Sequence, residues 1–219
     1  MSNFRRRLLM QQGGSILPSG CQAISYLQSS ETQWIDTEHI CLSNESILID
    51  FEVLDFNKVT NVVAYGWRNK GSYTDPYQFY INASNSTEIK SYYGVKGNQA
   101  NTTIGKRNER IRLEIMPKSQ QILANGEIWN GLRGWTDQYG GNYSACLFTF
   151  NVLGTPNTSV IGNVRIYEYA VKKPNDEYVQ HFVPIVDKNG VACMYDIANK
   201  KYYYNKGTGE FIKGQNIKL

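Results

Sequence analysis

Two carboxylates stand two positions apart in the segment Ile49-Asp50-Phe51-Glu52 and are the first candidates for chemistry in this sequence. Side chains alternate along a β-strand, so Asp50 and Glu52 would share one face of a strand here. A retaining glycoside hydrolase needs two carboxyl groups about 5–5.5 Å apart, one of them protonated near neutral pH. A charged strand face in water gives the same pattern, and we interpret the pair as solvated charges rather than as a catalytic dyad.

Other signatures of catalysis are missing from the sequence. There is no Gly-x-Ser-x-Gly elbow, and His39 and His181 stand in no recognisable triad context. The segment Gly66–Gly71 lacks the Lys-Ser/Thr pair that completes a phosphate-binding loop. The sequence therefore predicts neither an enzyme nor a cofactor.

The cysteines give no metal signature. They are widely spaced, without a Cys-x-x-Cys pair, at Cys21, Cys41, Cys146 and Cys193. Since the chain has only two histidines to complete a site, this spacing predicts no zinc or other metal centre. Free cysteines are usually buried, and Cys193 lies in an alternating segment, so we expect buried thiols made in a reducing compartment.

Binding has better support, because the segments Trp129–Tyr143 and Tyr65–Tyr77 combine aromatic, amide and glycine residues. Aromatic rings stack on sugar C–H groups and polar side chains hydrogen-bond hydroxyls, yet the same residues are enriched at subunit interfaces. Loop packing, a protein interface and glycan contact therefore all stay open, and Asp75 and Asp137 alone do not make a calcium site. The candidate ligand or interface residues are Trp67, Trp129, Arg133, Trp135, Asp137, Tyr139, Asn142 and Tyr143.

The composition favours β-strands as the elements that hold these residues. Sixteen tyrosines, eight phenylalanines, four tryptophans and 19 glycines among 219 residues suit one sandwich of short strands and many turns.

The formal net charge is only +4, much of it at Arg5–Arg7, so no nucleic-acid partner is predicted. The apolar run Leu8–Met10 is too short for a signal peptide or a membrane span, so we expect neither.

Alternation with a period of two predicts most of the strands. In Arg110–Met116, for example, Ile111, Leu113 and Ile115 would face one way while the charged residues face the other. We expect about twelve to fourteen strands in two sheets, and no helix beyond a turn near Gly20–Leu27. The strand segments are Ile47–Val53, Asn61–Trp67, Tyr77–Ile81, Ile89–Val95, Arg110–Met116, Gln121–Ala124, Glu127–Trp129, Ala145–Val152 and Val160–Val171.

Turn signals at Lys188–Gly190, Ala198–Lys200 and Lys206–Gly209 divide the C-terminal region into short segments. Asn-Gly supplies the positive φ angles of a two-residue hairpin turn, so the region reads as a tight β-meander. Its predicted strands are Val183–Val186, Val191–Tyr195, Lys201–Tyr204 and Phe211–Ile212. We expect the core to be closed by Phe182, Val183, Tyr195 and Phe211.

Two boxes carry a resemblance to a known family. The opening box is LPSGCQAISYLQSSETQWIDT (Leu17–Thr37), and the closing box is HFVPIVDKNGVACMYDIANKKYYYNKGTGEFIKG (His181–Gly214). With both boxes in this order, the chain resembles the concanavalin A-like (laminin G-like) jelly-roll modules of gut Bacteroidales and their crAss-like phages. The resemblance implies an all-β, two-sheet antiparallel jelly-roll sandwich over residues 17–219. Hydrolases of that fold carry Glu-x-Asp-x-x-Glu or Glu-x-Asp-x-Glu on one strand, and here no third carboxylate completes the box.

The resemblance, taken with the missing signal peptide, implies a non-enzymatic virion structural protein. We expect a head fibre or capsid decoration that assembles in the host bacterial cytoplasm, contacts capsid or other virion proteins and further copies of itself, and displays a jelly roll for glycan or host-surface adhesion. Residues 1–16 would be the anchoring arm, although a solvated tail is an alternative. The alternative function is a bacterial glycan-binding module or a tail-fibre component. The predicted anchor residues are Phe4, Arg5, Arg6, Arg7, Leu8, Leu9 and Met10.

Overall fold

The computed structural model describes residues 16–54, 62–68, 78–83, 88–94, 100–119, 121–131 and 143–219. Within these ranges the chain forms β-strands and two 3-10 turns, η1 (Pro117–Ser119) and η2 (Thr158–Val160). None of the described residues forms a helix with the length and apolar character needed to cross a bilayer. Residues 1–15 of the predicted arm lie outside the described residues, so its boundary with the sandwich stays a prediction.

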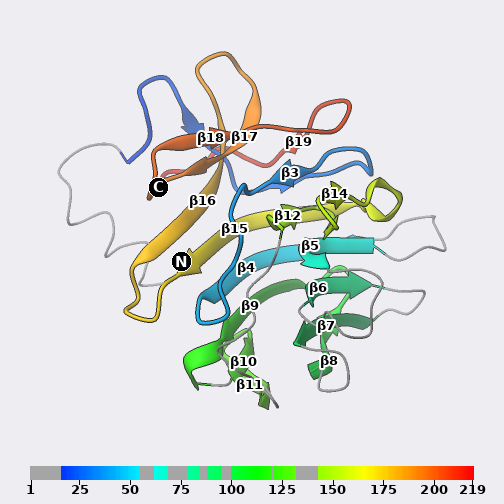
Figure 1. Ribbon diagram of the computed structural model, residues 1–219. Helices are drawn as coiled ribbons and strands as arrows, with labels where there is room; N and C mark the ends of the chain where they lie inside the picture. Colours follow the sequence, from blue (N-terminus) through cyan, green and yellow to red (C-terminus); the bar gives the residue numbers. More distant parts are fainter. Residues whose placement is uncertain are drawn as a thin grey trace.

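The larger sheet contains the long strands that run across the centre of Figure 1. Its order is β11-β10-β9-β4-β15-β16-β17-β18, and the short strands β1, β2 and β19 pair with β16 and β15 at one end. The described pairs in this sheet are antiparallel. The bounds are β1 (Gln22–Ala23), β2 (Leu27–Gln28), β4 (Ser46–Val53), β9 (Arg110–Met116), β10 (Gln121–Ala124), β11 (Glu127–Gly131), β15 (Val164–Lys172), β16 (Tyr178–Val186), β17 (Ala192–Asp196), β18 (Lys201–Tyr203) and β19 (Ile212–Lys213).

The smaller sheet has the order β14-β13-β5-β6-β7-β8, with β12 and β3 joined to it through β5. Its described pairs are antiparallel except for β13 with β5, which is parallel. The bounds are β3 (Ile35–Asp36), β5 (Val62–Arg68), β6 (Gln78–Ala83), β7 (Glu88–Gly94), β8 (Ala100–Lys106), β12 (Cys146–Leu147), β13 (Asn151–Val152) and β14 (Thr155–Pro156). The predicted fold class, an all-β two-sheet antiparallel jelly-roll sandwich, is therefore confirmed.

The main core lies between the two sheets. Alternation along β4 and β9 turns Ile49, Phe51 and Leu113 inward, where they meet Tyr65 of β5 and Ile81 of β6, all of them fully buried. A second, smaller apolar cluster lies on the other face of β16 and β17 and includes Val183, Ile185, Cys193 and Tyr195. Phe182 and Phe211 belong to the main core, whereas Val183 and Tyr195 belong to this second cluster, which corrects the prediction that all four close one core.

The opening and closing boxes of the sequence pack against each other. Lys206 N donates to Trp34 O (2.9 Å), and Thr208 N donates to Thr32 O (3.2 Å). Trp34 N donates to Asn205 Oδ1 at 3.2 Å. The two stretches that carry the family resemblance therefore form one structural unit, although about 170 residues separate them.

Several secondary-structure predictions differ from the structure. Residues 20–27 contain β1 and the start of β2 rather than a helical turn. The segment Phe211–Ile212 does not extend the meander, because β19 pairs with β2 and not with β18. Strand β8 was not predicted, since Ala100–Lys106 is rich in small polar residues and Ile104 is its one large apolar side chain. The long predicted strand Ala145–Val152 is divided into β12 and β13 around Phe148, which has a positive φ of 69°.

Candidate functional site

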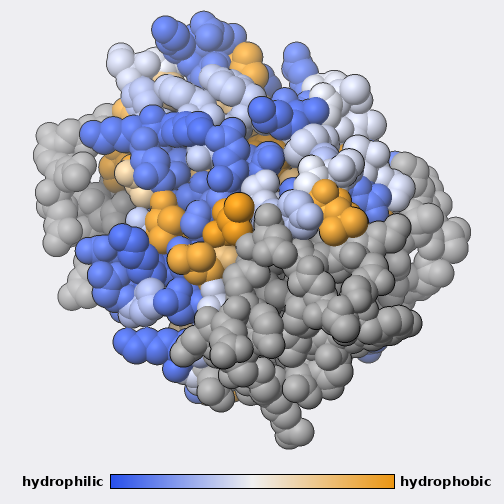
Figure 2. All heavy atoms as spheres, in the orientation of Figure 1, coloured by the Kyte–Doolittle hydropathy of each residue, from blue (hydrophilic) through white to orange (hydrophobic). Residues whose placement is uncertain are grey.

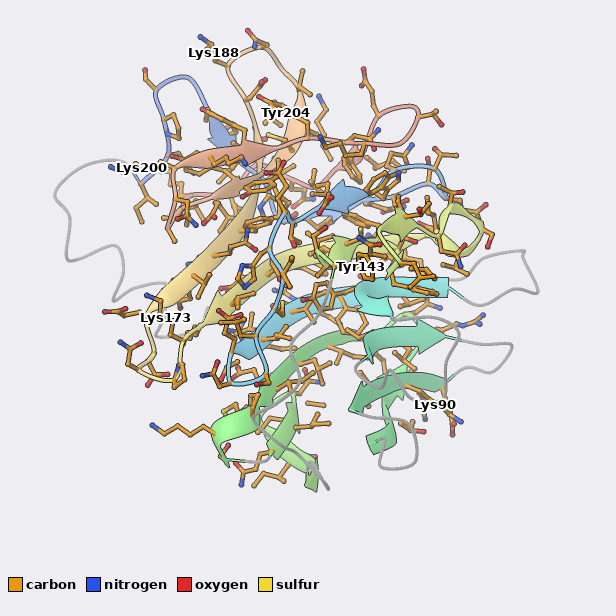
Figure 3. The ribbon with its side chains drawn as sticks, viewed as in Figure 1. Lys90, Tyr143, Lys173, Lys188, Lys200 and Tyr204 are labelled. Atoms are coloured by element: carbon orange, nitrogen blue, oxygen red, sulfur yellow. The ribbon has the colours of Figure 1, made fainter. Side chains whose placement is uncertain are left out.

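Most of the predicted binding residues lie where no side chain is described. The anchor residues Phe4–Met10 and the loop residues Arg133, Trp135, Asp137, Tyr139 and Asn142 are outside the described residues, while Trp67 and Trp129 are placed only as backbone, in β5 and β11. Tyr143 is partly exposed (Figure 3). A Cβ atom added to Gly154 would lie 3.3 Å from Tyr143 Cε1, so the Tyr143 ring packs against the turn that contains Gly154. The ligand role of these residues stays a prediction.

A second group of polar and aromatic side chains lies on the outward face of the larger sheet. Antiparallel pairing places Asp50 opposite Arg112 and Glu52 opposite Arg110, with all four side chains turned away from the core. In β15 the register shifts between Ile166 and Glu168, so Tyr167 is an extra residue that a β-bulge directs to the same outward face. We call this set the outward polar face: Tyr26, Asp50, Glu52, Arg110, Arg112, Arg165, Tyr167, Glu168, Tyr178 and His181.

Glu52 organises one end of this face. Its Oε2 accepts hydrogen bonds from Tyr167 Oη (2.7 Å) and from Arg165 (3.1 Å). The Arg165 guanidinium also donates to Gln28 Oε1 at 2.9 Å and lies 4.6 Å from the centre of the Tyr26 ring. Burial, and then the hydrogen bond to Glu52, raise the pKa of Tyr167 to about 12, so this phenol stays protonated and acts as a donor.

Asp50 organises the middle of the face. It accepts two hydrogen bonds from Arg110, at 2.7 and 2.8 Å, in the parallel arrangement that suits a guanidinium and a carboxylate. The same guanidinium lies 3.9 Å from the centre of the Tyr167 ring. Asp50 is 4% exposed, so the interpretation of Asp50 and Glu52 as solvated charges was wrong for Asp50: burial under Arg110 replaces water with a paired cation.

Glu168 organises the other end. It accepts from Arg112 at 2.8 Å and lies 2.9 Å from His181 Nε2, and Tyr178 stacks on the His181 ring at 4.6 Å and 13°. Burial raises the pKa of Glu168, but His181 and Arg112 lower it by more, to about 2. Glu168 is therefore ionised near neutral pH and cannot serve as the protonated acid that glycoside hydrolysis requires.

The arrangement fixes planar polar groups in place and leaves their edges in contact with solvent. The side chain of Arg110 is 51% exposed, and those of Arg112 and Arg165 are 29% exposed. Each guanidinium is bound to a carboxylate that is much less exposed than itself. Such a surface can offer directed hydrogen-bond donors beside aromatic rings, which is the chemistry that recognises sugar hydroxyls and ring C–H groups.

A small hollow adjoins the face where β4 begins and where β9 and β15 end. It has a volume of about 60 Å³ and is lined by Ser46, Ile47, Leu48, Glu114, Ile115, Met116, Lys172 and Asp176. Typical small-molecule pockets enclose ~300–1,000 Å³. This hollow has room for one substituent of a ligand and not for a whole sugar ring.

A separate cluster could hold a metal ion. One ligand atom each from His39, Cys41 and Glu45 lies within 4.8 Å of the other two. All three residues come from the segment between β3 and β4, which crosses β15 in the view of Figure 1. The prediction of no metal site relied on the absence of Cys-x-x-Cys, and the spacing His39-x-Cys41-x-x-x-Glu45 is the signal that could have found this cluster.

Comparison with known proteins gives structural neighbours and no family. No protein-family model matches the chain, and no curated protein matches it. Among solved structures, the Ruminococcus gnavus IT-sialidase CBM40 is similar at 15% identity and a TM-score of 0.45, over 72% of this chain and 91% of that one. The same module bound to α2,3-sialyllactose gives 16% identity and a TM-score of 0.44, over 72% and 92%. Bound to α2,6-sialyllactose it gives 14% and 0.39, over 70% and 93%. At these TM-scores, the neighbours assign no ligand and no residue role to this chain.

Proposed function

We propose that this protein is a non-catalytic glycan-binding module and that the outward polar face is its contact surface. The observation that carries the proposal is the fixing of partly exposed guanidinium groups by less exposed carboxylates and tyrosine rings, at Arg110 and Arg165 above all. A long side chain loses up to about 2 kcal/mol of conformational entropy when it is immobilised. Here that loss occurs on folding, so a ligand would meet donors that are already oriented.

The character of the face sets the expected mode of binding. The adjoining hollow of about 60 Å³ is too small for a sugar ring, so the glycan would lie across the strands. A shallow contact of this kind gives low affinity at one site, and several linked copies raise the overall avidity by ~10²–10⁴. Display of several copies on one particle would therefore suit this surface.

We further propose that the particle is a phage virion. The support is the resemblance of the opening and closing boxes to modules of gut Bacteroidales phages. In this proposal the arm at residues 1–16 attaches the protein to capsid or other virion proteins, and the jelly roll projects as a head fibre or capsid decoration with further copies of itself. Assembly would take place in the host cytoplasm. If peptides of this protein were absent from purified particles, the alternative of a bacterial glycan-binding module would replace this one.

The glycan proposal is tested by screening the full chain, presented in several copies on a bead, against an array of bacterial and mucosal glycans. Arg165→Gln removes a guanidinium whose side chain is 29% exposed, while Glu52 keeps its hydrogen bond from Tyr167, so binding should fall without unfolding. Lys188→Gln, in the exposed turn after β16 (Figure 3), is the matched loss of a cation and should have no effect.

Two results would count against the proposal. If no glycan is retained by the wild-type protein, glycan binding itself is excluded. If a glycan is retained and is lost with Trp135→Ala but not with Arg165→Gln, the contact surface lies in the predicted loop Trp129–Tyr143 and not on the outward polar face.

A further inference from the structure

The segment between β3 and β4 is held in place by hydrogen bonds at both of its ends. At its start, Thr37 N donates to Ala145 O (2.9 Å), and Ala145 N donates to His39 O (3.1 Å). At its end, Glu45 N donates to Leu42 O at 3.2 Å, and Leu42 N donates to Glu45 Oε2 at 2.8 Å. The backbone therefore fixes the positions of His39 and Glu45 before any ligand arrives.

Three different donor atoms converge inside this segment. His39 Nε2 and Glu45 Oε2 are 2.8 Å apart, and Cys41 Sγ completes a group whose atoms all lie within 4.8 Å of one another. Zinc takes thiolate, imidazole and carboxylate ligands at ~2.0–2.3 Å in a tetrahedral arrangement, which separates the ligand atoms by roughly 3.3–3.8 Å. The 2.8 Å between His39 Nε2 and Glu45 Oε2 is shorter than this range, so a small side-chain rotation would be needed to admit the ion.

Neighbouring groups orient two of the three donors. Tyr65 Oη lies 3.6 Å from Cys41 Sγ and 3.1 Å from Tyr169 Oη, and both tyrosines are fully buried. The hydrogen bond from Leu42 N holds the carboxylate of Glu45 in the same way. Contacts of this kind are typical of the shell around a metal, where they fix the direction of each ligand.

The burial of the cluster also suits a bound dication. Cys41 is fully buried and Glu45 is 4% exposed, so an ion held by them would be shielded from water on this side. Zinc binds cysteine as the thiolate, so an ion of charge +2 would take the place of the thiol proton and lie beside the Glu45 carboxylate. Mixed sulfur, nitrogen and oxygen donors in a tetrahedral setting select zinc over calcium or magnesium, which prefer oxygen alone.

We propose that His39, Cys41 and Glu45 bind a zinc ion that ties the β3–β4 segment together at the edge of the sandwich. Three protein ligands leave one position for water or for a group from outside. The side chain of His39 is 19% exposed, which gives that position access to solvent. Two exposed apolar residues of the same segment, Ile40 at 47% and Leu42 at 54%, stand on either side of Cys41 in the chain. Among the described residues coloured in Figure 2, apolar side chains form small groups in a largely hydrophilic surface.

The test uses the full chain, stripped with a chelator and titrated with Co²⁺, which reports thiolate ligands through a charge-transfer absorption in the near ultraviolet. The expected result is one Co²⁺ per chain with that absorption, displaced by one equivalent of Zn²⁺. Cys41→Ser should abolish the absorption. Cys193→Ser, a buried thiol on the far side of the larger sheet, is the matched control and should leave it unchanged.

A second variant separates metal binding from folding. His39→Ala changes a partly exposed side chain and should keep the fold, while zinc affinity measured by equilibrium dialysis falls by at least ~10–100-fold, the loss seen even for outer-shell changes. Absence of the thiolate absorption in the wild-type protein would overturn the proposal. So would absorption that survives Cys41→Ser, or zinc affinity unchanged by His39→Ala.

Discussion

Arg110 is held from two sides, because Asp50 takes two of its hydrogen bonds and the ring of Tyr167 lies 3.9 Å from its guanidinium. Arg165 repeats the arrangement with Glu52 and Tyr26. An exposed arginine that paired only with water would be free to turn and would contribute little to recognition or stability. At the scale of the residue, the outward polar face is therefore an ordered surface.

The contribution of Glu168 to the stability of the fold depends on pH. Its folded pKa of about 2 is below its ordinary value of 4.5, so its contribution to stability is complete above about pH 4.5 and is lost as the pH falls toward 2. The contribution should be about 3 kcal/mol near neutral pH. Urea denaturation at pH 7 and pH 3 should show Glu168→Gln to be less stable at pH 7 and to lose less on acidification. Glu177→Gln, in an exposed turn, is the control, and equal pH dependence in the two variants would contradict the assignment.

Tyr195 tests the second apolar cluster. It is 3% exposed and packs on Tyr202 with ring centres 5.1 Å apart. Removing a buried aromatic side chain typically destabilises a protein by about 3–5 kcal/mol. Tyr195→Ala should show a loss of this size in thermal unfolding. Tyr204→Ala, at a residue that is 41% exposed, should show a clearly smaller loss. An unchanged melting temperature for Tyr195→Ala would refute the placement.

At the scale of the element, the contact between the opening and closing boxes has a steric requirement. A Cβ on Gly207 would lie 1.9 Å from Thr32 O, closer than any two such atoms can approach. Gly207, the first glycine of the Gly-Thr-Gly sequence, is therefore required, because the backbones of two distant chain segments are in contact there. This contact gives the opening and closing boxes a physical reason to occur together in one chain.

Gly207→Ala should consequently destabilise the fold by about 3 kcal/mol or more, since the Thr32 backbone must move to admit a methyl group. Gly126→Ala is the matched control. It has a φ of +86° but no atom within 4 Å of the added Cβ, so it should lose only the ~1–2 kcal/mol of a left-handed backbone. Melting temperatures of the two variants compare the two costs directly. A loss for Gly207→Ala no larger than that for Gly126→Ala would show that the boxes are not in this contact.

Local sequence patterns predicted most of the strands, and they failed where the existence or place of a strand depends on the strands with which it pairs. Alternation found β9 at its observed bounds, Arg110–Met116, because one face of that strand is apolar throughout. The same reasoning missed β8, whose residues carry little hydrophobic signal, and it joined β19 to the wrong neighbour. Only some residues of the outward polar face could be recognised from the sequence. Asp50 and Glu52 were recognised, but their pairing with Arg110, Arg165 and Tyr167 depends on strand order and on a β-bulge.

At the scale of the whole molecule, the three carboxylates of the outward polar face are arranged for binding rather than for catalysis. Asp50 is bound to Arg110, Glu52 to Arg165 and Glu168 to Arg112, so each is paired with an arginine of its own. We therefore expect no hydrolysis when the purified protein is incubated with bacterial or mucosal polysaccharides and the released reducing ends are measured. Hydrolysis that disappears with Asp50→Ala or Glu52→Ala would overturn this expectation.

The attachment of the whole molecule to a particle is the last prediction, and it concerns the arm. Arg5, Arg6 and Arg7 can pair bidentately with carboxylates of a partner, while Phe4 and the run Leu8–Met10 can fill apolar pockets. The described strands begin at Gln22, so deletion of residues 1–14 removes none of them. The truncated protein should melt at the same temperature as the full chain and should no longer appear in purified particles. Normal incorporation of the truncated protein would instead place attachment on the jelly roll, where the segment Trp129–Tyr143 would be the first to test by substitution.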